Sequence, residues 1–138
     1  MLVVNPLEHF DLAENLLYAL HQHLVAVTAQ TAAVDLLAKH RAWLTRTDFT
    51  PFIRRGRDHG EPTASIRWRA AHTALHCGQL PCSTSQAAVL RIAVSLATGI
   101  PVNLRDALGS LDHHDTAHVI RAVSLVHDNC TEGNDHDR

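Results

Sequence analysis

Apolar residues in the first part of the chain recur at alternating spacings of three and four, which is the repeat of one helix face. This seam consists of Phe10, Ala13, Leu17, Leu20, Leu24 and Val27. Asn5 and Pro6 stand just before it, as an N-cap and a first helical residue would. The pattern predicts a helix over residues 6–27.

A second apolar stripe predicts another helix that ends near Thr45. It consists of Ala33, Leu36, Leu37, Trp43 and Leu44. Residues 28–31 either separate the two helices or lie inside one long helix, and the sequence leaves both arrangements open. Together the two stripes predict an N-terminal helical hairpin over residues 1–47.

Glycine and proline mark the next boundary. Asp48 is placed to cap a short helix that ends before Gly56. The segment from Gly56 to Pro62 combines glycine, proline and charged side chains, which is typical of a loop. We therefore predict a short helix and a loop over residues 48–62.

The second half of the chain carries regular helix start and stop signals. One helix is predicted from Ile66 or Trp68 to Cys77, because Gly78 can adopt the left-handed conformation that ends a helix. Ser83 and Gln86, three residues apart, form a capping-box pattern for the next helix. That helix, AAVLRIAVSLAT, is almost entirely apolar and ends before a glycine, so we expect it in the core.

Two further cap patterns complete the predicted elements. Asn103 with Asp106 precedes a short helix, and Asp112 with Asp115 precedes a last helix that reaches about residue 128. The polar end of the chain, residues 130–138, is predicted to be a flexible tail. Because no stretch alternates with a period of two, we predict an all-α protein. It would combine the N-terminal helical hairpin with a C-terminal bundle of about four helices over residues 63–129.

Composition narrows the class of protein. The chain has 138 residues, 46% of them hydrophobic and 19% charged, which are values for a globular domain with a sizeable core. No apolar run has the roughly 18 residues that a membrane span requires, and the start MLVVNPLEHF lacks the pattern of a secretion signal. Three cysteines suit a reducing compartment better than a disulfide scaffold. We therefore expect a cytoplasmic protein that does not contact membranes.

Charge is distributed unevenly along the chain. The net charge is −2, yet residues 41–70 carry seven arginines against three acidic residues. A basic middle between acidic ends indicates either a footprint for phosphate or an acidic partner, or a solvated surface that neutralises its own neighbours. The candidate contact residues are Arg54, Arg55, Arg57, Arg67 and Arg69.

One motif, HTALHCGQLPC, combines histidine and cysteine. His72, His76, Cys77 and Cys82 offer nitrogen and sulfur ligands of the kind that zinc accepts in a tetrahedron. Cys77 directly follows His76, however, so on a helix their side chains point about 100° apart. We prefer the interpretation that both cysteines are small buried groups at a helix junction, and we expect no metal and no cofactor. A zinc-binding protein is the alternative.

A second histidine group lies at the start of the last predicted helix. It consists of Asp112, His113, His114, Asp115 and His118, and we interpret it as a surface helix cap. The chain contains no glycine-rich phosphate loop, no G-x-S-x-G and no H-E-x-x-H motif. We assign no catalytic residues and predict a protein without enzymatic activity.

Residues 103–128 fit the outline of a helix-turn-helix motif. The turn lacks the usual glycine, and the candidate recognition helix carries one arginine, Arg121, beside acidic residues. Its apolar positions, Val119, Ile120, Val123 and Val126, favour a core helix over a helix that reads a DNA groove. If nucleic acid is bound, the arginine-rich middle is the better source of phosphate contacts.

The run from Trp68 through Ser83, followed by VLRIAVSLATGIPVNLRDALGSLD, resembles small helical proteins of GC-rich bacteria that have no established activity. The resemblance covers residues 43–126 and implies a helical fold without implying a mechanism. Arg67 departs from it, because such proteins place an acidic residue before the tryptophan.

These observations predict a non-enzymatic interaction or regulatory protein. We expect a homodimer through the seam of residues 10–27, because apolar residues beside that seam widen the surface beyond what one neighbouring helix covers. A protein partner fits the same interpretation. Binding of nucleic acid is the alternative that we favour less.

Overall fold

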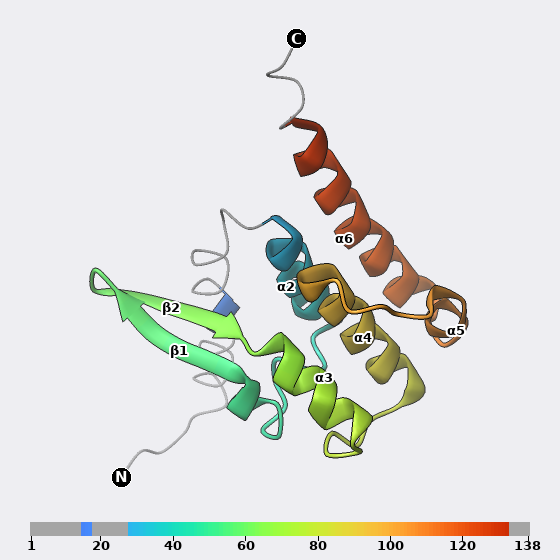
Figure 1. The fold of residues 1–138 in the computed structure, drawn as a ribbon, viewed down its shortest axis with the longest axis horizontal. Coiled ribbons are helices and arrows are strands. Elements are labelled where there is room, and N and C mark those ends of the chain that lie inside the picture. The colour runs from blue at the N-terminus through green and yellow to red at the C-terminus, as the bar shows by residue number, and fades with distance from the viewer. Residues whose placement is uncertain (1–14, 18–27, 133–138) are drawn as a thin grey trace.

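The computed structural model describes residues 15–17 and 28–132, with side chains described to Asp128. Residues 15–17 are helical. The elements that follow are α2 (Thr28–His40), η1 (Thr50–Phe52), β1 (Ile53–Asp58), β2 (Glu61–Ile66), α3 (Trp68–His76), α4 (Thr84–Thr98), α5 (Leu104–Gly109) and α6 (His113–Glu132). Figure 1 shows the helices gathered together and the two strands extending away from them.

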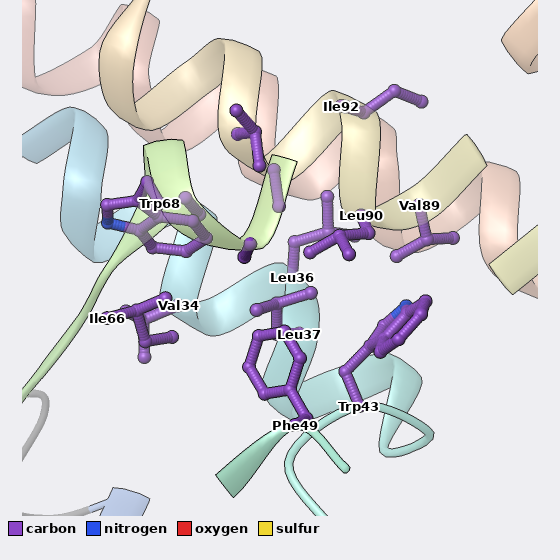
Figure 2. Close-up of a cluster of buried hydrophobic side chains, with 14 of the residues drawn as sticks. Val34, Leu36, Leu37, Trp43, Phe49, Ile66, Trp68, Val89, Leu90 and Ile92 are labelled. Atoms are coloured by element: carbon purple, nitrogen blue, oxygen red, sulfur yellow. The ribbon is translucent and has the colours of Figure 1, made fainter. Parts of the chain in front are cut away.

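Helix α4 is the centre of the helical part. It packs against α2, α3, α5 and α6, and α2 also packs along α6. The apolar sequence of α4 predicts this position, and the structure confirms it. Buried residues from α4 and α2 meet in the core that Figure 2 shows, where Leu90 of α4 lies near Leu36 of α2.

The helix caps in the second half are confirmed. Ser83 accepts a hydrogen bond from the Gln86 backbone N–H, and the Gln86 side chain accepts one from the Ser83 N–H in return. Asn103 accepts from the N–H of Asp106, and Asp112 accepts from the N–H of Asp115. These contacts span three residues each, so they form without help from distant parts of the chain. α6 extends to Glu132, further than the sequence pattern predicts.

Helix α2 ends earlier than its apolar stripe predicts. It stops at His40, and Arg41 takes a positive φ of 69° that turns the chain away from the helix axis. Trp43 therefore lies in a turn, yet its side chain is fully buried. Its indole Nε1–H donates to the backbone carbonyl of Gln86 at 2.9 Å, which ties this turn to the start of α4.

The all-α prediction is wrong, because residues 53–66 form an antiparallel β-hairpin. A two-residue turn closes it at His59 and Gly60, whose φ values are 50° and 82°. Positive φ at both central residues is the geometry of a type I′ turn, whose twist matches that of the flanking strands. Gly56 and Pro62, which the sequence predicts to be loop residues, are strand residues. Both strands of a two-stranded ribbon are edge strands, and edge strands tolerate proline.

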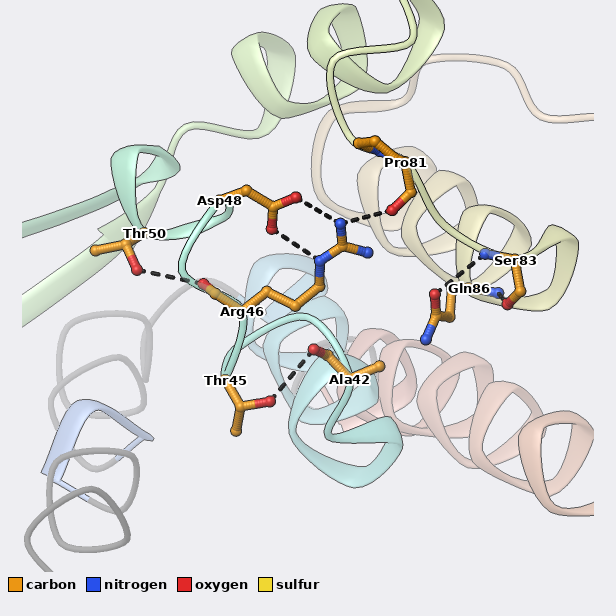
Figure 3. Close-up of polar contacts among 8 residues, drawn as sticks. All are labelled: Ala42, Thr45, Arg46, Asp48, Thr50, Pro81, Ser83 and Gln86. Carbon is orange, nitrogen blue, oxygen red and sulfur yellow. Dashed lines mark hydrogen bonds and ion pairs between the residues drawn. The ribbon is translucent and has the colours of Figure 1, made fainter. Parts of the chain in front are cut away.

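The segment before the hairpin is held by one arginine. The Arg46 guanidinium donates from Nε to the Asp48 carboxylate at 2.8 Å and from a terminal nitrogen to the other oxygen of that carboxylate. The same nitrogen also donates to the Pro81 carbonyl at 2.6 Å, as Figure 3 shows. The guanidinium carbon lies 4.6 Å from the centre of the Trp43 ring. Asp48, predicted to cap a helix, pairs with Arg46 instead, and η1 has no side-chain cap.

We expect Arg46→Lys to lower the free energy of unfolding by about 1–2 kcal/mol, because an ammonium cannot make the paired hydrogen bonds or stack on the indole in the same way. Hydrogen bonding to Arg46 lowers the pKa of the Asp48 carboxyl. The stabilisation that this shift reports is present at neutral pH and is lost as the pH falls through the lowered pKa. Urea unfolding at neutral and acidic pH measures both effects. Arg91→Lys, at an exposed position of α4, is the control and should change neither.

Of the predicted N-terminal hairpin over residues 1–47, the structure describes residues 15–17 and 28–47. The described part of the chain has no helix long and apolar enough to cross a membrane. Of the predicted dimer seam, Leu17 is described and is half-buried; Phe10, Ala13, Leu20, Leu24 and Val27 lie outside the described residues. Leu16, which lies beside the seam, is 7% exposed and belongs to the core.

Candidate functional site

The hairpin arm, defined as residues 53–66, is exposed along most of its length. In β1 every residue after Ile53 is exposed, and in β2 only Ala64 and Ile66 are buried. These three buried residues anchor the end of the arm nearest the helices, and Ile53 and Ile66 pair across it. The arm extends from the helical part with its turn at the far end, as Figure 1 shows.

The pairing register separates the side chains of the arm into two faces, because successive strand residues point to opposite sides. The inner face carries the buried residues and consists of Ile53, Arg55, Arg57, Pro62, Ala64 and Ile66. The outer face consists of Arg54, Gly56, Asp58, Glu61, Thr63 and Ser65. The three arginines of β1 are therefore divided, with Arg55 and Arg57 on the inner face and Arg54 on the outer face.

The arginines of the arm have no acidic partner among the described residues. Arg54, Arg55 and Arg57 are all exposed, and no side-chain hydrogen bond or ion pair joins them to another described residue. Arg55 and Arg57 make the inner face of this narrow ribbon positive, whereas the outer face carries Arg54 near the helices and acidic residues near the tip. Acidic groups lie at the tip instead, where Asp58 faces Glu61 across the turn and lies 3.5 Å from His59 Nε2.

Two more of the predicted arginines lie at the base of the arm. Arg67 follows β2 directly, and its backbone N–H donates to the Phe52 carbonyl at 2.7 Å, one step beyond the paired strands. Arg69 is exposed in the first turn of α3. The structure thus gathers all the arginines of the predicted set along the arm and at its base, although it does not place them on one face.

The candidate zinc ligands of the sequence do not come together as a metal site. These residues are His72, His76, Cys77 and Cys82. In the described residues no group of three or more His, Cys, Asp or Glu side chains is arranged to hold a metal ion. Cys77 was expected to be buried at the helix junction, but it is exposed because α3 ends there and Gly78 turns the chain back. His76 and Cys82 share the rim of a hollow of about 540 Å³. Arg91 and Asp106 line the same hollow, so its charge is mixed and favours no single ligand class.

A half-buried histidine that the sequence did not single out, His40, lies between α2 and α6. His40 Nε2 is 3.5 Å from the Asp115 carboxylate, and the two side chains are 9% and 15% exposed. His40 Nδ1 is buried without a hydrogen-bond partner among the described residues. His113 and His114, which the sequence did single out, are exposed at the start of α6. The contact with Asp115 joins the end of α2 to the start of α6.

The predicted helix-turn-helix corresponds to α5 and α6. Val119 and Ala122 of α6 are buried and Val126 is half-buried, as expected for a core helix. Ile120 and Val123, also expected in the core, are 61% and 51% exposed. They point away because α6 uses the opposite side of its surface to pack on α2. That exposed side carries few cations, and Arg121 is already paired with Asp35 at 3.3 Å.

Comparison of the chain with protein-family models, curated proteins and solved structures gives no match.

Proposed function

We propose that this chain is a non-enzymatic protein that binds nucleic acid through the hairpin arm. The observation that carries the proposal is the division of the unpaired arginines, with Arg54 on one face of the ribbon and Arg55 and Arg57 on the other. A flat acidic surface would contact the arginines of only one face of the ribbon. A groove has two charged walls, so it can contact the arginines of both faces at once.

The dimensions of the arm support a groove as its binding site. Each strand has six residues and spans about 20 Å at about 3.4 Å per residue. The major groove of B-form DNA is about 12 Å wide and admits a two-stranded β-ribbon. An arm lying in such a groove would bring arginines toward the phosphates of both walls, while the acidic tip would be repelled from the backbone. Binding lengthwise, rather than tip first, follows from this charge pattern.

The main test is the salt dependence of binding. Each phosphate neutralised on duplex DNA contributes about −0.9 to the slope of log K against log salt concentration. The variant Arg54→Gln, Arg55→Gln, Arg57→Gln should therefore reduce the steepness of the slope by about 2.7 and weaken binding at low salt. The measurement is fluorescence anisotropy of the full chain with a labelled duplex of mixed sequence, between about 50 and 200 mM salt.

A matched control removes the same charge elsewhere. Lys39, Arg91 and Arg105 are exposed on helices away from the arm, so changing all three to glutamine alters net charge equally. We expect that control to keep nearly the slope of the unchanged protein. Equal slopes for the two triple variants would show that net charge, and not the arm, determines binding, and would refute the proposal.

A further inference from the structure

The outer face of the arm contains a hollow of about 270 Å³. It is lined by Arg54, Arg55, Gly56, Thr63, Ala64 and Ser65. The register turns the side chains of Arg55 and Ala64 to the inner face, so the outer side chains at this hollow are those of Arg54, Thr63 and Ser65. Gly56 pairs with Thr63 across the strands, and its missing side chain leaves the space of the hollow.

Gly56 is not required by the backbone. The positive-φ glycines among the described residues are Gly60, Gly78 and Gly99, so Gly56 has a conformation open to other residues. Glycine weakens the interior of a strand, because it loses more conformational freedom and has no side chain to pack. A Cβ built at Gly56 would lie 3.3 Å from Thr63 Oγ1. Any larger side chain would occupy the hollow, so the glycine keeps it open.

The outer side chains offer hydrogen-bond donors suited to an anion. Thr63 and Ser65 are half-buried, and no hydrogen bond joins their hydroxyls to another described residue. Arg54 lies directly opposite Ser65 in the register and has an unpaired guanidinium. Guanidinium and hydroxyl groups are the side-chain donors that proteins commonly direct at phosphate oxygens.

We infer that this hollow is a seat for a single phosphate group of the nucleic-acid backbone, an inference that rests on the proposed function. The next pair along the outer face toward the tip is Asp58 and Glu61. Their carboxylates repel a second anion, which limits the seat to one phosphate. Arg55 and Arg57, on the inner face, would contact the backbone without such a seat.

The test separates hydrogen bonding from charge. The variant Thr63→Val, Ser65→Ala removes both hydroxyls and keeps every charge, and valine suits a strand. Affinity for the labelled duplex should fall about 10-fold, while the salt slope stays the same because the number of neutralised phosphates is unchanged. Gly56→Val, which fills the hollow, should weaken binding as well.

The control is Thr47→Val with Ser124→Ala, which makes the same chemical changes at exposed positions outside the arm. It should bind the duplex as the unchanged protein does. If the Thr63 and Ser65 variant also binds as the unchanged protein does, the seat is refuted, although the arm can still bind by charge alone.

A second measurement keeps the two proposals distinguishable. Inorganic phosphate is titrated into the full chain at constant ionic strength, with chloride as the reference anion, and the amide resonances of Gly56, Thr63 and Ser65 are followed by NMR. Phosphate-specific shifts that disappear in the Thr63 and Ser65 variant are expected. If the duplex does not bind but these shifts occur, the proposed function fails and the seat holds a free phosphate group. The absence of both refutes the seat and the function together.

Discussion

Replacing Trp43 with alanine is expected to lower the free energy of unfolding by about 3–5 kcal/mol, the range for removing a buried large aromatic side chain. Trp43 is fully buried, and its ring centre lies 5.5 Å from that of Phe49. The substitution removes this contact, the stacking of Arg46 and the hydrogen bond to the Gln86 carbonyl. Because small domains are stable by about 5–15 kcal/mol, this loss is a large share of the free energy of unfolding and should clearly lower the urea midpoint.

The conservative variant Trp43→Phe separates packing from hydrogen bonding. It keeps much of the buried aromatic surface and loses the indole donor, so we expect a loss of about 1–2 kcal/mol. Urea unfolding followed by far-ultraviolet circular dichroism measures both variants. A loss below about 1 kcal/mol for the alanine variant would mean that the turn after α2 does not hold the core together.

The helices and caps of the second half could be predicted because their causes are local. Ser83 and Gln86, three residues apart, satisfy each other's backbone groups wherever the helix packs. The end of α2 could not be predicted in this way. Trp43 continues the apolar spacing of the helix, but its buried position depends on Gln86, forty-three residues later. Helical spacing and a buried turn residue give the same sequence pattern.

The sequence did not predict the hairpin, because its strands contain too few apolar residues to show an alternation of apolar and polar positions. Only Ile53, Ala64 and Ile66 are buried, and only the last two show a period of two within one strand. The turn residues His59 and Gly60 were a usable signal, since a glycine at the second position of a two-residue turn suits positive φ. Gly56 and Pro62 favoured a loop over this turn signal, because both residues commonly interrupt strands.

The sequence indicated which arginines belong to the candidate site, but it did not indicate how they are arranged. The excess of arginine between residues 41 and 70 identified the set. The division of Arg54 from Arg55 and Arg57 depends on the pairing register, and so does the position of Gly56 opposite Thr63. A shift of one residue in the register would exchange the two faces. The hollow beside Gly56 could therefore not be predicted from the sequence alone.

The core that supports the arm should respond to small changes at its centre. Leu90 of α4 is fully buried and lies near Leu36 of α2, as Figure 2 shows. Leu90→Ala removes buried methyl groups and leaves a cavity between two helices that cannot fully close it, so we expect a loss of about 2–5 kcal/mol. Ile120→Ala is the matched control, because Ile120 is 61% exposed on α6 and its truncation should change stability by less than about 0.5 kcal/mol.

The same pair of variants tests whether the arm works independently of core stability. Under conditions where Leu90→Ala is still folded, its affinity for duplex DNA should equal that of the unchanged protein, because the arm contributes only Ile53, Ala64 and Ile66 to the buried core. Urea unfolding gives the stability difference, and anisotropy at low salt gives the affinity. A folded Leu90→Ala protein that has lost the salt-dependent binding would show that the helical core, and not the arm alone, forms the binding surface.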